Sequence, residues 1–92
     1  MVYFVSFVKI LANISELNDH MFFECMSLKD IYIPQTLSFI GENAFCYCDS
    51  LRSITNYQQI NTIYSNSFED CELLNEEITK HFSSITVLLD AF

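Results

Sequence analysis

Glycine and basic residues are scarce in this 92-residue chain, and each scarcity excludes a class of function. The single glycine excludes phosphate-cradling loops, which need several close backbone approaches. Four Lys and Arg residues stand against 12 Asp and Glu residues, which gives a formal net charge of −8. Such a charge repels phosphate, so we expect no nucleic-acid partner and no anionic membrane partner. Gly41 is the only residue free to take a positive φ angle without steric cost.

Apolar residues, by contrast, are abundant. Hydrophobic residues make up 51% of the chain and aromatic residues 15%, which is too much for a disordered segment. A chain of this length buries only about 60–65% of the surface that its unfolded form exposes. The sequence therefore predicts one domain, residues 1–92, with one core.

The cysteines reveal an internal repeat. Cys25, Cys48 and Cys71 are spaced by 23 residues, as are Phe22, Phe45 and Phe68. Equal spacing is typical of a repeat rather than of a disulfide framework. Four further columns share this spacing, and the pattern continues up to Ala91-Phe92 once one inserted residue is allowed after Leu74. The columns are Val5, Leu28, Leu51 and Leu74; Val8, Ile31, Ile54 and Ile78; Ile14, Leu37 and Ile60; and Leu17, Ile40, Ile63 and Val87.

A repeat of this kind predicts a solenoid, because each unit has an apolar edge that only stacking on the next unit can bury. Within a unit, the ending Leu-x-x-Ile-x-Ile alternates as a short strand does, with Ile31 and Ile33 inward and Tyr32 outward. The fold class is therefore a solenoid of about four coils with a short parallel β-sheet. The Phe-x-x-Cys segments between strands fit either turns or one-turn helices.

Two stretches, Ile40 to Leu51 and Cys25 to Pro34, resemble the BspA-type leucine-rich repeat, whose pattern is Ile-Gly-x-x-Ala-Phe-x-x-Cys-x-Ser-Leu-x-x-Ile-x-Ile-Pro. The match is closest from Phe22 to Cys71, and Pro34 has no equivalent in the other units. The resemblance implies a leucine-rich-repeat fold and a protein-interaction or adhesion role, with surface-exposed examples in bacteria and parasitic protists. It implies no catalytic activity.

The cysteines and histidines are predicted to be structural. Cys46-x-Cys48 supplies half of a metal site at most, since zinc takes four ligands and His20 and His81 fall in different columns. We therefore expect buried thiols, no metal, no cofactor and no enzyme. Cys46 lies off the repeated column, so it is expected to be the exposed and reactive thiol.

The acidic run from Glu69 to Glu77 invites a calcium interpretation, but it lacks the alternation of ligands around a glycine, and a solvated face with a bulge at the insertion is favoured. The stretch Met1 to Ile14 carries Lys9 and has no basic start or cleavage site, so a repeat coil is predicted rather than a signal peptide. It is also too short for membrane insertion. The compartment stays open, with cell surface or secretion following only from the family resemblance.

The outward columns of the predicted strands are the candidate binding surface. Side chains repeated on each coil build a ladder, and tyrosines there suit recognition of a protein partner. The candidate partner-binding residues are Lys9, Asp30, Tyr32, Ser53, Thr55, Tyr57 and Thr79. A third outward column holds Leu11, Pro34, Tyr57 and His81.

The alternative is a structural segment of a longer solenoid with no binding site of its own. No polar caps are evident at Met1 to Val5 or at Ala91-Phe92, and uncapped ends would allow self-association.

Overall fold

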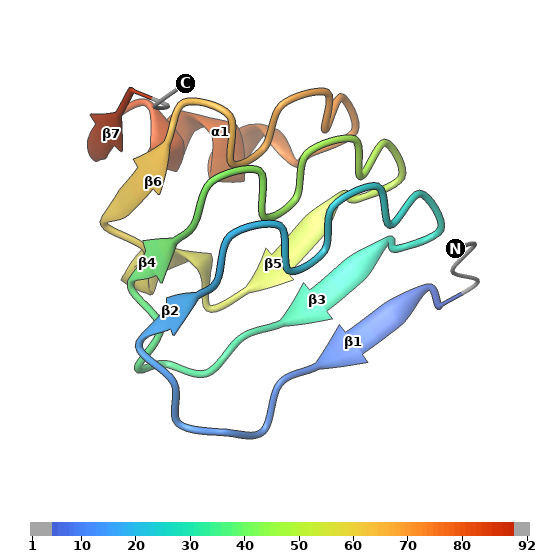
Figure 1. The fold of residues 1–92 in the computed structure, drawn as a ribbon, viewed down its shortest axis with the longest axis horizontal. Helices are drawn as coiled ribbons and strands as arrows, with labels where there is room; N and C mark the ends of the chain where they lie inside the picture. The colour runs from blue at the N-terminus through green and yellow to red at the C-terminus, as the bar shows by residue number, and fades with distance from the viewer. Residues whose placement is uncertain (1–4, 90–92) are drawn as a thin grey trace.

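The computed structural model describes residues 5–89, which wind into stacked coils of a short solenoid (Figure 1). Two parallel sheets line it, sheet A with the order β1–β3–β5 and sheet B with the order β2–β4–β6–β7. The strands of sheet A are β1 (Phe7–Lys9), β3 (Asp30–Tyr32) and β5 (Ser53–Thr55), and those of sheet B are β2 (Glu16–Leu17), β4 (Phe39–Ile40), β6 (Thr62–Tyr64) and β7 (Thr86–Leu88).

The strand pairing confirms the 23-residue register, and it adds a second sheet that the sequence did not predict. Ile63 pairs with Val87, an offset one residue longer than the others, which confirms the insertion after Leu74. Sheet B forms because its column also alternates between inward and outward residues. The aligned inward residues are Val8, Ile31 and Ile54 in sheet A, and Leu17, Ile40, Ile63 and Val87 in sheet B.

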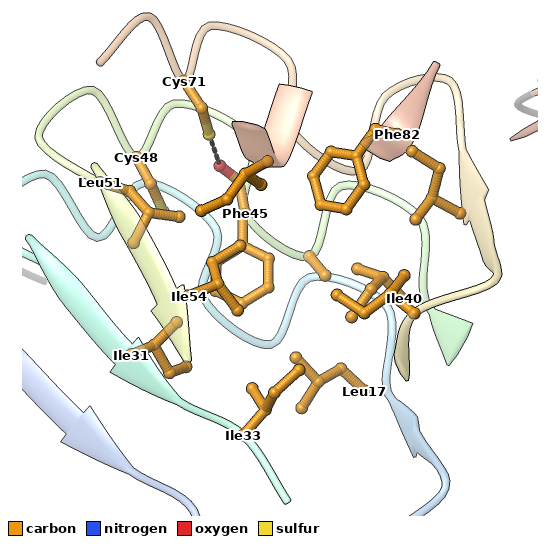
Figure 2. Close-up of a cluster of buried hydrophobic side chains, with 14 of the residues drawn as sticks. Leu17, Ile31, Ile33, Ile40, Phe45, Cys48, Leu51, Ile54, Cys71 and Phe82 are labelled. Atoms are coloured by element: carbon orange, nitrogen blue, oxygen red, sulfur yellow. Dashed lines mark hydrogen bonds between the residues drawn. The ribbon is translucent and has the colours of Figure 1, made fainter. Parts of the chain in front are cut away.

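The space between the two sheets is filled by one cluster of buried apolar side chains (Figure 2). Phe45 is fully buried, and its ring stacks between Phe22 and Phe68 with centroid distances of 5.3 and 5.0 Å. Each Phe-x-x-Cys segment is a tight turn in which the cysteine N–H donates to the phenylalanine carbonyl three residues before it. The repeated columns are therefore the core, as the periodicity predicts.

The fourth coil departs from the prediction: Ile78, expected in a strand, lies in helix α1 (Glu76–Phe82). The repeated backbone ladder continues as far as Asn75, whose N–H donates to the Arg52 carbonyl at 2.9 Å. The Asn75 side chain then caps the helix by accepting from the Glu77 N–H at 2.8 Å. The inserted residue and the two following glutamates therefore start a helix and do not form a bulge.

Helix α1 covers the phenylalanine side of the last coil and presents a polar side to solvent. Ile78 and Phe82, four residues apart, are buried, and the Phe82 ring stacks on Phe68 at 4.5 Å. The opposite side of the helix is exposed, with Glu76 and Lys80 in its first and last turns, where they complement the helix dipole. The phenylalanine stack thus ends on Phe82.

The turns do not depend on glycine. Gly41 has no positive φ, whereas six other residues between 5 and 89 do, including Glu24, Tyr47 and Asp70 at equivalent positions of successive coils. The energetic cost of this conformation is offset by hydrogen bonding between coils, since the Glu24 N–H donates to the Cys46 carbonyl at 2.9 Å. Gly41 is needed for another reason: a Cβ there would lie 2.7 Å from the backbone of Asp19.

Among residues 5–89, none of the helices is long and apolar enough to cross a bilayer. The predicted match of Ala91-Phe92 to Ala44-Phe45 lies outside the described residues.

Candidate interaction face

Sheet A brings five of the seven candidate residues onto one outward face. Strand alternation turns Ile31 and Ile54 into the core, where they are 1% and 3% exposed, and turns their neighbours outward. Strands β1, β3 and β5 lie side by side (Figure 1). Their pairing sets these outward residues in two rows across the strands. The rows are Phe7, Asp30 and Ser53, and Lys9, Tyr32 and Thr55.

A hydrogen-bonded pair fixes the first row. The Ser53 hydroxyl donates to Asp30 Oδ1 at 2.6 Å, and Arg52 Nε lies 3.4 Å from the same oxygen. The hydrogen bond from Ser53, and then the charge of Arg52, hold the pKa of Asp30 below its ordinary value. Asp30 therefore presents a charged and oriented carboxylate to solvent.

A cation–π contact fixes the second row. Lys9 Nζ lies 4.9 Å from the centroid of the Tyr32 ring, across the paired positions of β1 and β3. Thr55 continues the row on β5 and is exposed. The face therefore combines an aromatic ring positioned by a cation–π contact, an ammonium group, a carboxylate and hydroxyls.

Tyr57 and Thr79 do not lie on this face, contrary to the prediction. Tyr57 begins the short 3-10 helix η1 (Tyr57–Gln59), is half-buried against the core, and meets His81 of α1 edge to face at 5.5 Å. Thr79 lies on α1, where its hydroxyl donates to the Glu76 carbonyl at 2.9 Å. Thr79 was misplaced because the fourth coil forms a helix where a strand was expected. Tyr57 leaves the face because the chain turns at Asn56, which has a φ of 72°, and then enters η1.

The third predicted outward column is not a continuous surface. Pro34 is buried, whereas Leu11 of the same column is 79% exposed. His81, also in this column, donates from Nε2 to the Ile60 carbonyl at 2.7 Å, which joins α1 to the preceding coil. Pro34 and His81 therefore have structural roles, whereas Leu11 is exposed.

The cysteines are free thiols, and two of them serve the turns. Cys48 donates to the Phe22 carbonyl at 3.0 Å and Cys71 to the Phe45 carbonyl at 2.8 Å (Figure 2). The neighbouring Cys48 thiol, together with burial, raises the pKa of Cys71. The Cys48 and Cys71 side chains therefore replace solvent as partners for turn carbonyls.

Cys46 is buried, with 2% of its surface exposed, so the prediction of an exposed and reactive thiol was wrong. It lies in the middle coil, where its column neighbours Phe23 and Glu69 lie on the adjacent coils. Burial, and then the nearby charges of Glu69 and Asp70, raise the pKa of Cys46 to about 11. Within residues 5–89, no cluster of three or more His, Cys, Asp and Glu side chains is placed to hold a metal ion.

The outward face of sheet B is not among the surfaces that the sequence predicts. This face carries Phe39 and Tyr64, whose ring centroids are 5.9 Å apart, beside a hollow that has Gly41 in its lining. The available indication was the column Asn18, Gly41, Tyr64, in which one position lacks a side chain. It was overlooked because only one sheet was expected.

Comparison with known proteins agrees with this architecture. The model of the BspA type leucine-rich repeat region, described as six copies, matches residues 4–89. No curated protein sequence gives a significant match. The crystal structure of a T. pallidum leucine-rich repeat protein superposes with a TM-score of 0.61 at 22% identity, covering 73% of this chain. The chain spans 38% of that protein's length, and the likeness concerns the fold.

Proposed function

The chain belongs to the BspA-type leucine-rich repeat family, and on that premise we propose that it is a protein-binding module that contacts its partner through the outward face of sheet A. Such families and folds are typical of interaction or structural repeats rather than of enzymes. We further propose that this binding serves adhesion at a cell surface. The main supporting observation is the cation–π contact between Lys9 and Tyr32, next to an Asp30 carboxylate that accepts a hydrogen bond from Ser53.

Preorganisation supports this choice of face. Binding usually costs the entropy of ordering side chains at the interface, about 0.5–1.5 kcal/mol for each long one. On sheet A, contacts within the free chain already position Lys9, Tyr32 and Asp30, so less ordering is left for a partner to impose. An aromatic ring that keeps a polar tip is also the kind of residue that dominates binding energy at interfaces.

The test compares capture of a partner by four forms of the chain. We expect Tyr32→Ala and Asp30→Ala to weaken binding of the captured partner by at least about tenfold, since truncated anchor residues cost that much or more. Tyr47→Ala is the matched control, because Tyr47 is 42% exposed on the turns rather than on sheet A. Affinities from surface plasmon resonance that stay within twofold for both sheet A variants would refute the proposal.

A second candidate, a structural segment of a longer solenoid, is favoured by the exposed apolar residues near both ends of the stack. Val87 continues the buried column of Ile40 and Ile63, yet it is 46% exposed. At the other end, Phe7 is 56% exposed. A core-facing residue left open at the end of a stack, such as Val87, is what the next coil of a longer solenoid would cover.

Sedimentation velocity separates the two candidates. A structural segment is expected to self-associate with rising concentration, and Val87→Asp is expected to reduce the association, since it places a charge in the contact. Thr86→Asp is a matched control, because Thr86 lies on the outward side of the same strand. A chain that stays monomeric throughout would remove this candidate.

A further inference from the structure

The outward face of sheet B carries a hollow beside Gly41. Asn18, Gly41 and Tyr64 occupy equivalent positions of successive coils, at or just after the ends of strands β2, β4 and β6. These strands lie side by side in Figure 1. Gly41 is itself buried, and it lines the hollow together with Asn18 and Tyr64. The hollow has a volume of about 500 Å³ and is open to solvent.

The glycine at this place is enforced by the packing of the coil before it. A Cβ on Gly41 would lie 2.6 Å from Asp19 Oδ1 and 2.7 Å from the Leu17 carbonyl oxygen. The Gly41 N–H donates to that same carbonyl at 2.9 Å, which fixes the spacing of the two coils. The two coils are therefore held close together at the Gly41 side of the hollow.

Two aromatic rings stand on one side of the hollow. The centroids of Phe39 and Tyr64 are 5.9 Å apart and their planes are inclined by 36°. Both residues line the hollow and are half-buried, so their rings are partly open to a ligand. Aromatic faces attract cations, and planar guanidinium groups stack on them.

Two carboxylates complete the lining. Asp19 is held in place because its Oδ1 accepts from the Glu42 N–H at 2.8 Å. Glu16 is exposed, and neither Glu16 nor Asp19 forms an ion pair with any of residues 5–89. The hollow therefore adds local negative charge to a chain whose formal net charge is already −8.

We propose that this hollow receives an arginine side chain of a protein partner. The guanidinium stacks against Phe39 and Tyr64, and it donates hydrogen bonds to the carboxylates of Glu16 and Asp19. Arginine fits better than lysine because its planar, forked group can stack on a ring and bind a carboxylate at once. The site lies on sheet B, so it does not depend on the proposed role of sheet A.

The single glycine makes the test direct, since Gly41 gives the only glycine amide signal in a two-dimensional ¹H–¹⁵N spectrum of the chain. The chain is titrated with Nα-acetylarginine methylamide, and separately with the lysine and citrulline analogues; citrulline has nearly the same shape without the charge. We expect arginine to shift the Gly41 and Tyr64 signals with a dissociation constant on the order of millimolar. Lysine should bind at least threefold more weakly, and citrulline should cause no shift.

Two variants that each remove one exposed carboxylate complete the design. Glu16→Gln is expected to weaken arginine binding by about fivefold, within the range of a lost charge-assisted hydrogen bond. Glu24→Gln is the matched control, since Glu24 lies on the turns and not in the hollow; it should leave the affinity unchanged. Dispersed spectra of both variants establish that they are folded.

Several results would overturn the proposal. These are the absence of a Gly41 shift with arginine, equal shifts with citrulline, equal affinity for lysine, or the same loss of affinity in both glutamine variants. The last result would mean that arginine responds only to the overall charge of the chain.

Discussion

Replacing Gly41 by alanine gives the sharpest test of how the coils are spaced. Gly41 has no positive φ angle, so alanine can adopt its backbone conformation without strain. At such a position the substitution normally stabilises a protein by about 0.4–1 kcal/mol, because the unfolded chain loses freedom. A view that explains this glycine by turn conformation alone would therefore predict a more stable variant.

The packing predicts the opposite sign. The new Cβ would lie 2.6 Å from Asp19 Oδ1, and 2.7 Å from both the Asp19 nitrogen and the Leu17 carbonyl oxygen. Two of these three atoms belong to the backbone, so the contact is relieved only by moving one coil away from the other. Overpacking of this kind costs about 1–3 kcal/mol, which exceeds the gain from the unfolded state. We expect a net destabilisation of about 1–2 kcal/mol.

Urea unfolding followed by circular dichroism measures this difference. For a chain of this size the expected loss lowers the melting temperature by about 5–15 °C. Asn18→Ala is the matched control, since Asn18 is exposed in the same column and should change stability by less than about 0.5 kcal/mol. An alanine variant at Gly41 as stable as the parent, or more stable, would refute the account of the coil spacing.

Three further predictions concern the cap, the sheet A face and the buried thiols. Phe82→Ala should lower the free energy of unfolding by about 3–5 kcal/mol in urea titrations, because a buried ring is removed from the end of the stack; a loss under about 1 kcal/mol would contradict the capping role. Ser53→Ala should raise the pKa of Asp30 toward its ordinary value, as followed by carboxyl NMR, since the folded-state pKa is lowered chiefly by this hydrogen bond. The stabilising effect of ionised Asp30 should accordingly be present above its unfolded pKa and be lost as the pH falls through the lower, folded-state pKa; an unchanged pKa in the variant would argue against the pair. Cys46, with a pKa of about 11, should stay unlabelled by a disulfide reagent at about pH 8 until the chain is unfolded, since roughly one thiol in a thousand is then ionised; mass spectrometry finding Cys46 labelled in the folded chain would contradict its burial.

The stacked coils could be predicted from the sequence because the same side chains recur with one period. Ile31 and Ile54 alternate with polar neighbours, and Phe45 recurs at the same distance from each strand. Such columns determine both which side chains are buried and which strands pair. The position of Lys9, Tyr32 and the other sheet A residues followed from that register.

Helix α1 was missed because the apolar spacing in this segment fits two structures. Ile78 matches the strand column once one residue is inserted, but Ile78 and Phe82 also share one face of a helix. The local residues favour the helix, since a capping asparagine precedes two glutamates, and Lys80 falls in the last turn. The prediction for this segment therefore followed the periodicity of the earlier coils, although the local sequence also contained helix signals.

The wrong prediction for Cys46 has a different physical cause. The sequence predicts burial from columns of similar residues, and the residues 23 positions before and after Cys46 are the dissimilar Phe23 and Glu69. Cys46 lies in a middle coil, where Glu69 of the next coil contacts its sulfur at 3.8 Å, whereas Tyr47 beside it is 42% exposed. A neighbouring coil can therefore cover a side chain whose column does not repeat. Burial in the turns therefore depends on position along the stack as well as on the repeated pattern.

The residues that repeat and the residues that do not repeat have different roles in this molecule. Repeated residues such as Ile40 and Phe45 are buried, so a partner cannot reach them. The groups proposed to bind are places where the repeat varies: Lys9 against Tyr32 on sheet A, and Gly41 against Tyr64 on sheet B. Since neighbouring coils are only one strand spacing apart, a change at one position of a column sets different groups side by side. Recognition by this chain should therefore respond to substitutions at its varied outward positions, whereas substitutions in the repeated columns should act through stability.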